Sequence, residues 1–175
     1  MQDDISVVLE AVQFAADRHG VQLRKEGLPY ITHPITVANT LSKRGYGLEY
    51  IITALFHDLL EDTETTYEEI EQWCEYHLAD PSLHRSIPEA VDILTTRGKK
   101  DQQYFERIKG NDIARIVKLV DRLHNLTTMK GLSPKWQKKY IEETWDFIIP
   151  LAKGTEFMGD IEKILMKREG SKDLK

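Results

Sequence analysis

Helix signals follow one another along almost the whole chain and leave little room for any other secondary structure. Residues 4–19 carry apolar side chains three or four positions apart, and this pattern stops at Gly20. Pro34 suits the first turn of a second helix, with Gly45 beyond its end. No run alternates polar and apolar residues for long enough to form a half-buried strand. The sequence therefore predicts an all-α protein.

The middle and late parts of the chain carry further helix signals. The segment 48–60 is apolar over most of its helical circumference, which is typical of a central buried helix. Thr66 with Glu69 and Ser86 with Glu89 have the spacing of capping boxes, so each pair is expected to open a helix. With no internal repeat or linker, we expect one domain over 1–170 and a loose polar tail over 171–175. Other helices are expected over 101–109, 112–130, from Ser133 onward, and over 156–168.

Composition argues against several classes of protein. Of the 175 residues, 41% are hydrophobic and 30% are charged, which is enough apolar material for a globular core. No stretch approaches the ~18 consecutive apolar residues of a membrane span. The net charge of −5 argues against a nucleic-acid polymer as partner, although a small phosphorylated ligand needs only a few cations. The acidic start resembles no signal peptide, and the single Cys74 cannot form an internal disulfide, so we expect a cytoplasmic protein.

An apolar segment, IITALFHDLLEDT, poses the first chemical question, because it suddenly carries four ionisable side chains. His57, Asp58, Glu61 and Asp62 fall within two helical turns. Desolvating them together costs several kcal/mol unless something compensates, and a divalent cation compensates well. On a helix, His57 and Asp58 can both lean towards one ion. An exposed, charged helix end is the alternative interpretation.

Two more polar residues stand in unusual places. Asp121 lies in a segment that is apolar on nearly every side, where a lone acid is costly unless it is paired or binds a metal. A salt bridge to Lys118 or Arg122 is the structural alternative. His33 precedes Pro34 at the entry to a helix, a rigid position from which to present an imidazole. These residues extend the candidate metal site to His33, His57, Asp58 and Asp121.

The order of these ligands, H, then HD, then D, resembles the HD-domain metallophosphohydrolase superfamily. In that superfamily the four matching side chains hold a divalent metal in a helical bundle. The chain is most similar to RelA/SpoT-type hydrolase domains and stand-alone small alarmone hydrolases. The similarity spans residues 11–152 and runs, in the family's order, through AVQFAADRHG, RKEGLPYITHP, HDLLEDT, VKLVDRLHN and IIPLA.

The resemblance adds chemistry to the site. Two imidazoles with two carboxylates suit Mn²⁺, Fe²⁺ or Zn²⁺ on ligand type alone, and the family it resembles typically uses manganese. The matching Glu-Asp pair of that family activates water or assists proton transfer. We therefore assign that role to Glu61 and Asp62 jointly, because two nearby carboxylates can titrate as a unit. Either residue could instead cap the next helix or bind a supporting water.

The resemblance also assigns substrate contacts. In the family, the residues matching Arg24 and Lys25 flank a guanine base, and a planar guanidinium can stack on such a ring. Asn125 and Thr128 lie on one helical stripe with Asp121, and their family counterparts reach ribose and phosphate. One departure is that Glu142 precedes Glu143 and Thr144, where the long enzymes commonly have arginine.

The resemblance implies a hydrolase of the stringent response that removes the 3′ pyrophosphate of guanosine tetra- or pentaphosphate (ppGpp or pppGpp), giving GDP or GTP. The alternatives are an HD-domain phosphatase acting on another nucleotide or phosphorylated dinucleotide, and a non-catalytic sensor. The expected partner is this small-molecule substrate, without a nucleic-acid polymer or a membrane. The sequence leaves the oligomeric state open.

Overall fold

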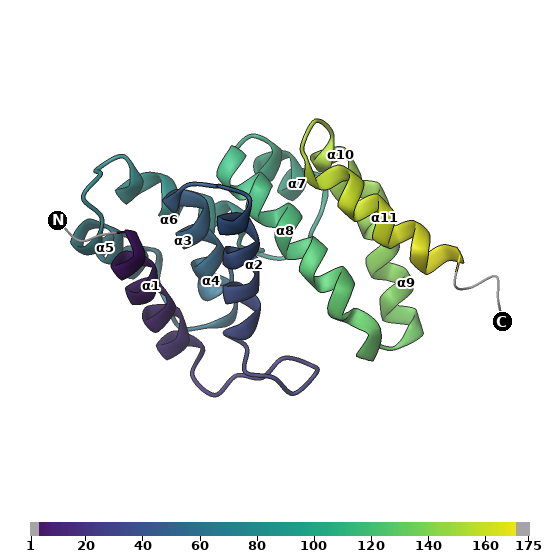
Figure 1. The fold of residues 1–175 in the computed structure, drawn as a ribbon, viewed down its shortest axis with the longest axis horizontal. Helices are drawn as coiled ribbons and strands as arrows, with labels where there is room; N and C mark the ends of the chain where they lie inside the picture. Colours follow the sequence, from purple (N-terminus) through teal and green to yellow (C-terminus); the bar gives the residue numbers. More distant parts are fainter. Residues whose placement is uncertain (1–3, 171–175) are drawn as a thin grey trace. The chain divides into compact units, whose positions relative to one another are not determined.

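Helices make up nearly all of the regular structure in this computed structural model, which describes residues 4–170 (Figure 1). Within that range there is no strand, and an isolated bridge pairs Leu23 with Pro29. The all-α prediction is confirmed, whereas the predicted tail at 171–175 lies outside the described residues. The chain divides into two compact units, Met1–Lys118 and Leu119–Lys175, each described by itself below.

The first unit contains the first seven helices of the described residues and the start of a long eighth helix. Within 4–170, none of the helices combines the length and apolar character that a bilayer crossing requires. The helices of this unit are α1 (Asp4–His19), α2 (Thr32–Lys43), α3 (Leu48–Phe56), α4 (Leu59–Asp62), α5 (Tyr67–His77), α6 (Leu83–Leu94), α7 (Gln102–Lys109) and the beginning of α8 (Asp112–Thr128).

Helix α3 is the centre of the first unit, because it packs against α1, α2 and α6. Its side chains Ile52, Leu55 and Phe56 are fully or almost fully buried. Burying a side chain of this size contributes about 1.5–3 kcal/mol, so this short helix anchors its neighbours. Helix α1 ends as predicted at Gly20, whose φ of +52° suits glycine better than any other residue.

The predicted continuous helix over 48–60 is wrong, because the chain turns at His57 and Asp58. Helix α3 ends at Phe56 and α4 begins at Leu59. Asp58 has φ −102° and ψ −3°, close to the sparsely populated region where many active-site residues lie. The break re-aims the side chains of His57 and Asp58, so their directions are not those of adjacent residues on a regular helix.

Two predicted capping boxes had opposite outcomes. Thr66 and Glu69 cap each other reciprocally at the start of α5, which confirms that prediction. The box at Ser86 and Glu89 is wrong, since α6 already begins at Leu83 and contains a proline. The earlier start is set by Asp80, whose carboxylate accepts from the Ser82 N–H at 2.9 Å and whose carbonyl accepts from the Leu83 N–H. A turn outside the predicted box therefore nucleates the helix.

The second unit continues α8 and follows it with shorter elements. The Ser133 side chain caps the helix after it, as expected. The π-helical turn was not predicted, and it packs against the helices on both sides of it. The elements are the end of α8, the 3-10 turn η1 (Met129–Gly131), α9 (Pro134–Glu143), the π-helical turn η2 (Thr144–Ile148), α10 (Ile149–Ala152) and α11 (Phe157–Gly170).

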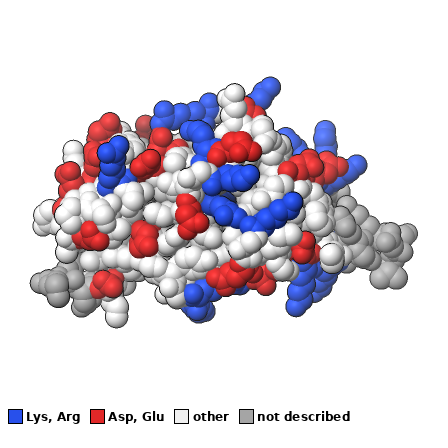
Figure 2. All heavy atoms as spheres, turned by 90° about the horizontal axis from the view of Figure 1, so that it is seen from above, with Lys and Arg blue, Asp and Glu red and all other residues white. Residues whose placement is uncertain are grey.

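Charged side chains of both signs are interspersed over the face drawn in Figure 2. This pattern accords with the modest net charge of −5. A nucleic-acid polymer typically needs a broad surface of one positive sign. The face seen here does not have that character.

Candidate metal centre

The first histidine of the candidate site is fixed by the entry to α2. His33 is the second residue of that helix and is 1% exposed. Its N–H donates to the Tyr30 carbonyl at 2.9 Å, and Pro34 restrains the backbone on its other side. The imidazole is therefore held in a dry position by the backbone around it.

The turn after α3 presents the second histidine with one ring nitrogen fixed by a hydrogen bond. Nδ1 of His57 lies 2.7 Å from the carbonyl oxygen of Ala54. Because a carbonyl can only accept, Nδ1 donates this hydrogen bond, and in the neutral ring the lone pair then lies on Nε2. This is the usual arrangement of a metal-binding histidine, in which one nitrogen is fixed by a hydrogen bond and the other faces the metal.

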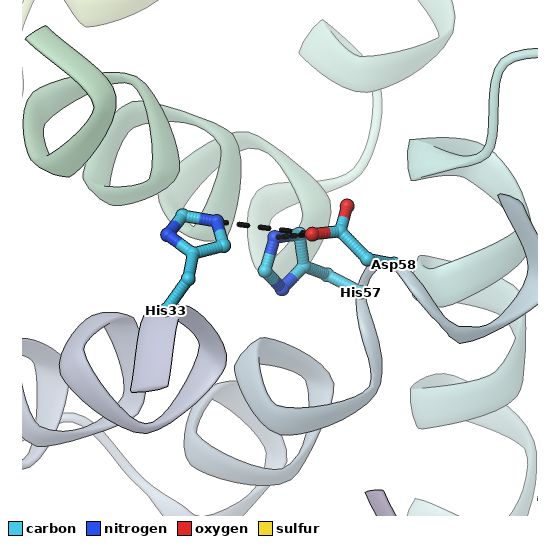
Figure 3. Close-up of side chains that lie close together, drawn as sticks. All are labelled: His33, His57 and Asp58. Carbon is cyan, nitrogen blue, oxygen red and sulfur yellow. Dashed lines mark ion pairs between the residues drawn. The ribbon is translucent and has the colours of Figure 1, made fainter. Parts of the chain in front are cut away.

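His33, His57 and Asp58 come together as a group that could hold a metal ion, with their ligand atoms all within 4.8 Å of one another. Oδ2 of Asp58 lies 3.0 Å from Nε2 of His57 and 3.8 Å from Nε2 of His33. Both imidazoles reach towards this carboxylate from neighbouring segments (Figure 3). A lone pair and a carboxylate oxygen 3.0 Å apart repel unless a positive charge joins them, either a proton or a metal cation. The donor set fits a divalent metal.

A tyrosine that sequence reasoning had not assigned completes the surroundings of Asp58. The Tyr30 hydroxyl lies 2.7 Å from Oδ2 of Asp58 and 2.8 Å from Oδ2 of Asp62. Burial, and then the two carboxylates, raises the pKa of Tyr30 far above its usual value, so the hydroxyl keeps its proton and donates. The only signal in the sequence was its place three residues before His33.

The two acids assigned jointly from the sequence have different surroundings. Asp62 contacts Tyr30 and, through it, the group containing Asp58. Glu61 instead accepts from the backbone N–H of Thr96 at 3.0 Å, beyond the end of α6. Burial raises the pKa of Asp62 more than the hydrogen bond from Tyr30 lowers it. Asp62 is therefore the acid linked to the metal centre.

The loop before α2 carries the two predicted base contacts. It turns at Gly27, which has a φ of +82°, and it closes with a bond from the Arg24 N–H to the Leu28 carbonyl. The Arg24 guanidinium lies 5.9 Å from the centre of the Tyr30 ring, and Lys25 is exposed. This arrangement puts Arg24 beside Tyr30, whose hydroxyl contacts Asp58. Contact of either side chain with a base remains a prediction.

The remaining predicted residues, Asp121, Asn125 and Thr128, belong to the second unit. Asp121 is buried and accepts a hydrogen bond from the Asn125 side chain. The Thr128 hydroxyl bonds to carbonyls of its own helix, at 3.3 and 3.4 Å. The fourth metal ligand and both ribose contacts remain predictions.

Arg122, one of the two salt-bridge partners considered for Asp121, pairs with a different acid. Its side chain is 1% exposed and binds the Glu143 carboxylate. It also donates to Thr144 Oγ1 at 3.1 Å and stacks 3.8 Å from the Tyr140 ring centre. The pair of Glu143 and Thr144 therefore serves as an internal partner for this arginine.

Comparisons with known proteins identify what the chain is similar to. A family model described as "HD domain" matches residues 11–80. The chain is 35% identical over 161 residues to "Guanosine-3′,5′-bis(diphosphate) 3′-pyrophosphohydrolase MESH1" of Xenopus tropicalis, covering 88% of this chain and 87% of that one. It is 34% identical to the "Bifunctional (p)ppGpp synthase/hydrolase SpoT" of Escherichia coli K12, but covers only 22% of that protein.

The length relation differs between these relatives. The chain spans about a fifth of the length of SpoT and of the "Probable GTP pyrophosphokinase" of Mycobacterium leprae, and 87% of the MESH1 relative of Xenopus tropicalis. A solved structure described as "A metazoan ortholog of SpoT hydrolyzes ppGpp and plays a role in starvation responses" matches with a TM-score of 0.76 at 23% identity, covering 93% of this chain and 96% of that one. That likeness shows that the two chains share a fold.

Proposed function

This chain belongs to the HD-domain family of SpoT- and MESH1-type proteins, and from that membership we propose that it removes pyrophosphate from the 3′ position of ppGpp or pppGpp. The products are GDP or GTP. The observation that carries the proposal is the group of His33, His57 and Asp58, linked through Tyr30 to Asp62. A cytoplasmic location and a part in the stringent response remain predictions.

The metal is proposed to be Mn²⁺, with Fe²⁺ or Zn²⁺ as alternatives. His33, His57 and Asp58 supply two imidazoles and a carboxylate, a mixed nitrogen and oxygen set that suits these ions. Asp121 is proposed as the fourth ligand. When bound, such a cation acts as a Lewis acid on a phosphoryl oxygen and lowers the pKa of a water.

The acids beside the metal centre are proposed to manage the proton of the attacking water. Asp62 is exposed enough to meet water, while partial burial raises its pKa and makes it a stronger proton acceptor than an ordinary carboxylate. Glu61, bound to the Thr96 N–H, holds the end of α6 in place and takes the smaller share of the chemistry. Asp62 is therefore the leading candidate for the general base.

The substrate is proposed to lie with its base at the Arg24 loop. Arg24 and Lys25 hold guanine, and Asn125 and Thr128 hold the ribose. Water adds to the proximal 3′ phosphorus, the bond from that phosphorus to the ribose 3′ oxygen breaks, and pyrophosphate departs. Water gives up one proton to Asp62, and the 3′ oxygen takes up a proton. The 5′ diphosphate is left untouched.

Phosphorus NMR of the reaction mixture tests this proposal. With Mn²⁺ and ppGpp, we expect GDP and pyrophosphate as the products, with no orthophosphate. Protein with His57→Ala serves as the inactive control. Cleavage of other nucleotides or phosphorylated dinucleotides with ppGpp left intact would contradict the alarmone proposal and favour an HD-domain phosphatase of different specificity.

A further inference from the structure

Tyr30 contacts two acids that have separate roles in the proposed mechanism. Its hydroxyl touches one oxygen of Asp58, a candidate metal ligand, and one oxygen of Asp62, the proposed base. A phenol has one proton, so the two carboxylates share a single donor. Without that donor, their like charges would push the two side chains apart. The hydroxyl therefore fixes the spacing between ligand and base.

The Tyr30 ring is itself held in place from several directions. It stacks on the His19 ring, with centroids 4.6 Å apart and planes 29° apart. The Arg24 guanidinium lies over the ring, 5.9 Å from its centre. In the backbone, the Tyr30 N–H donates to Gln22 and the Tyr30 carbonyl accepts from His33, each at 2.9 Å. The hydroxyl is thus carried on a ring with little freedom to turn away.

The same loop also supports the backbone of Asp62. The Gln22 amide nitrogen donates to the Asp62 carbonyl at 2.6 Å, so its Oε1 faces the buried His19. An oxygen can only accept, and Nδ1 of His19, 2.8 Å away, therefore donates. His19, Gln22 and Tyr30 form one chain of contacts that ends on both the backbone and the side chain of Asp62.

We propose that Tyr30 is a positioning residue that couples the substrate loop to the metal centre. Its hydroxyl sets the geometry of Asp58 and Asp62, and its ring lies beneath the guanidinium of Arg24. The role at the metal rests on the geometry alone, and the effect on turnover rests on the proposed function.

Tyr30→Phe is the direct test, because it keeps the ring and its stacking and removes only the hydroxyl. We expect Mn²⁺ affinity to fall roughly 10–100-fold, the usual cost of losing a group that orients a ligand. The measurement is a titration followed by electron paramagnetic resonance of free Mn²⁺, without any nucleotide. In the turnover assay we expect kcat to fall at least about tenfold while KM changes little.

Tyr50→Phe is a matched control, since the Tyr50 hydroxyl also donates to a carboxylate, Asp112, at 2.7 Å. The same chemical change made there should leave Mn²⁺ affinity unchanged. Arg24→Ala should raise KM with Mn²⁺ affinity intact. If Tyr30→Phe matched wild type in both Mn²⁺ affinity and kcat, the proposal would be overturned.

A measurement on the unmodified chain covers the case in which Tyr30→Phe folds poorly. With tyrosine labelled at the ring carbon that bears the hydroxyl, binding of diamagnetic Zn²⁺ should shift the Tyr30 resonance and leave Tyr50 in place. A bound ion without any shift at Tyr30 would contradict the proposal. Neither metal experiment uses ppGpp, so both test the role of Tyr30 even if the proposed substrate is wrong. A failure of the Tyr30 proposal would likewise leave the test of the substrate unaffected.

Discussion

Each of the two units contains a buried polar group, and the two groups differ in whether the chain itself supplies the positive charge. In the first unit, two imidazoles and a phenol converge on Oδ2 of Asp58. In the second unit, a positive charge belonging to the chain itself, Arg122, meets the Glu143 carboxylate, the Thr144 hydroxyl and the face of a tyrosine. Burial lowers the pKa of Arg122, but its neighbours outweigh that effect and leave the pKa raised.

The difference separates a structural group from a binding group. Around Arg122, the charge and its counter-charge are both supplied by the chain. Around Asp58, the atoms brought together are mainly those that bind a cation. A buried group rich in electron pairs is what a metal site requires. Burial of charged side chains does not by itself tell a structural group from a metal-binding group.

The largest effect is expected from removing a metal ligand. His57→Ala deletes the imidazole whose tautomer is fixed by Ala54, so bound metal and activity should both be lost. The loss of metal affinity should exceed the roughly 10–100-fold that supporting groups contribute. Metal content by mass spectrometry and turnover with ppGpp measure the two effects.

His77→Ala is a fair control for that substitution, because His77 stacks on Trp73 and takes no part in the metal centre. It should keep both metal and activity. Full manganese occupancy in His57→Ala would show that the group around Asp58 is structural, like the one around Arg122.

A smaller effect should separate Asp62 from Glu61. Asp62→Asn keeps the shape and can still accept from Tyr30, so metal is retained while kcat falls on the order of 10². Glu61→Gln can still accept from Thr96 and should cost much less. Equal losses of kcat from the two substitutions would indicate that Asp62 and Glu61 share the proton transfer.

The pH dependence of activity is a second way to distinguish the role of Asp62 from that of Glu61. Because the pKa of Asp62 is raised, the base is protonated at pH values where an ordinary aspartate, with a pKa of about 4, is ionised. Activity should therefore fall as pH drops through that raised value. The acidic limb of the kcat profile should be absent from the residual activity of Asp62→Asn and present in Glu61→Gln.

The smallest effect is expected on stability alone, in the second unit. Glu143→Gln leaves Arg122 buried without its main counter-charge, which should cost about 2–3 kcal/mol of unfolding free energy. The value lies below the roughly 3–5 kcal/mol of a fully buried pair because the Glu143 side chain is 21% exposed. Thermal unfolding should show a midpoint lowered by about 4–10 °C, with manganese binding kept.

Replacing both partners sharpens the contrast with the metal centre. Arg122→Met combined with Glu143→Gln removes the charge and its partner together, so most of the lost stability should return. No pair of apolar replacements at His57 and Asp58 should restore metal binding. A double variant as unstable as Glu143→Gln would show that the arginine contributes more than this charge pair.

Local signals in the sequence determined most of the helices and three of the site residues. Caps at Thr66 and Ser133 and the end of α1 at Gly20 depend on a few adjacent residues, so they could be predicted without the rest of the molecule. His33, His57 and Asp58 were found because polar side chains stood out against apolar surroundings. The structure brings these three side chains together, and their role as metal ligands remains a prediction.

Only the tertiary structure could decide the features that depend on residues far apart in the chain. The turn at His57 breaks an apolar run whose periodicity would continue a helix, and Tyr30 reaches Asp58 across 28 positions. Asp62 contacts Tyr30, whereas Glu61 contacts Thr96, so the two acids have different surroundings although they are neighbours in sequence. Helix periodicity and caps are properties of a few consecutive residues, whereas these contacts form only once distant segments have packed together.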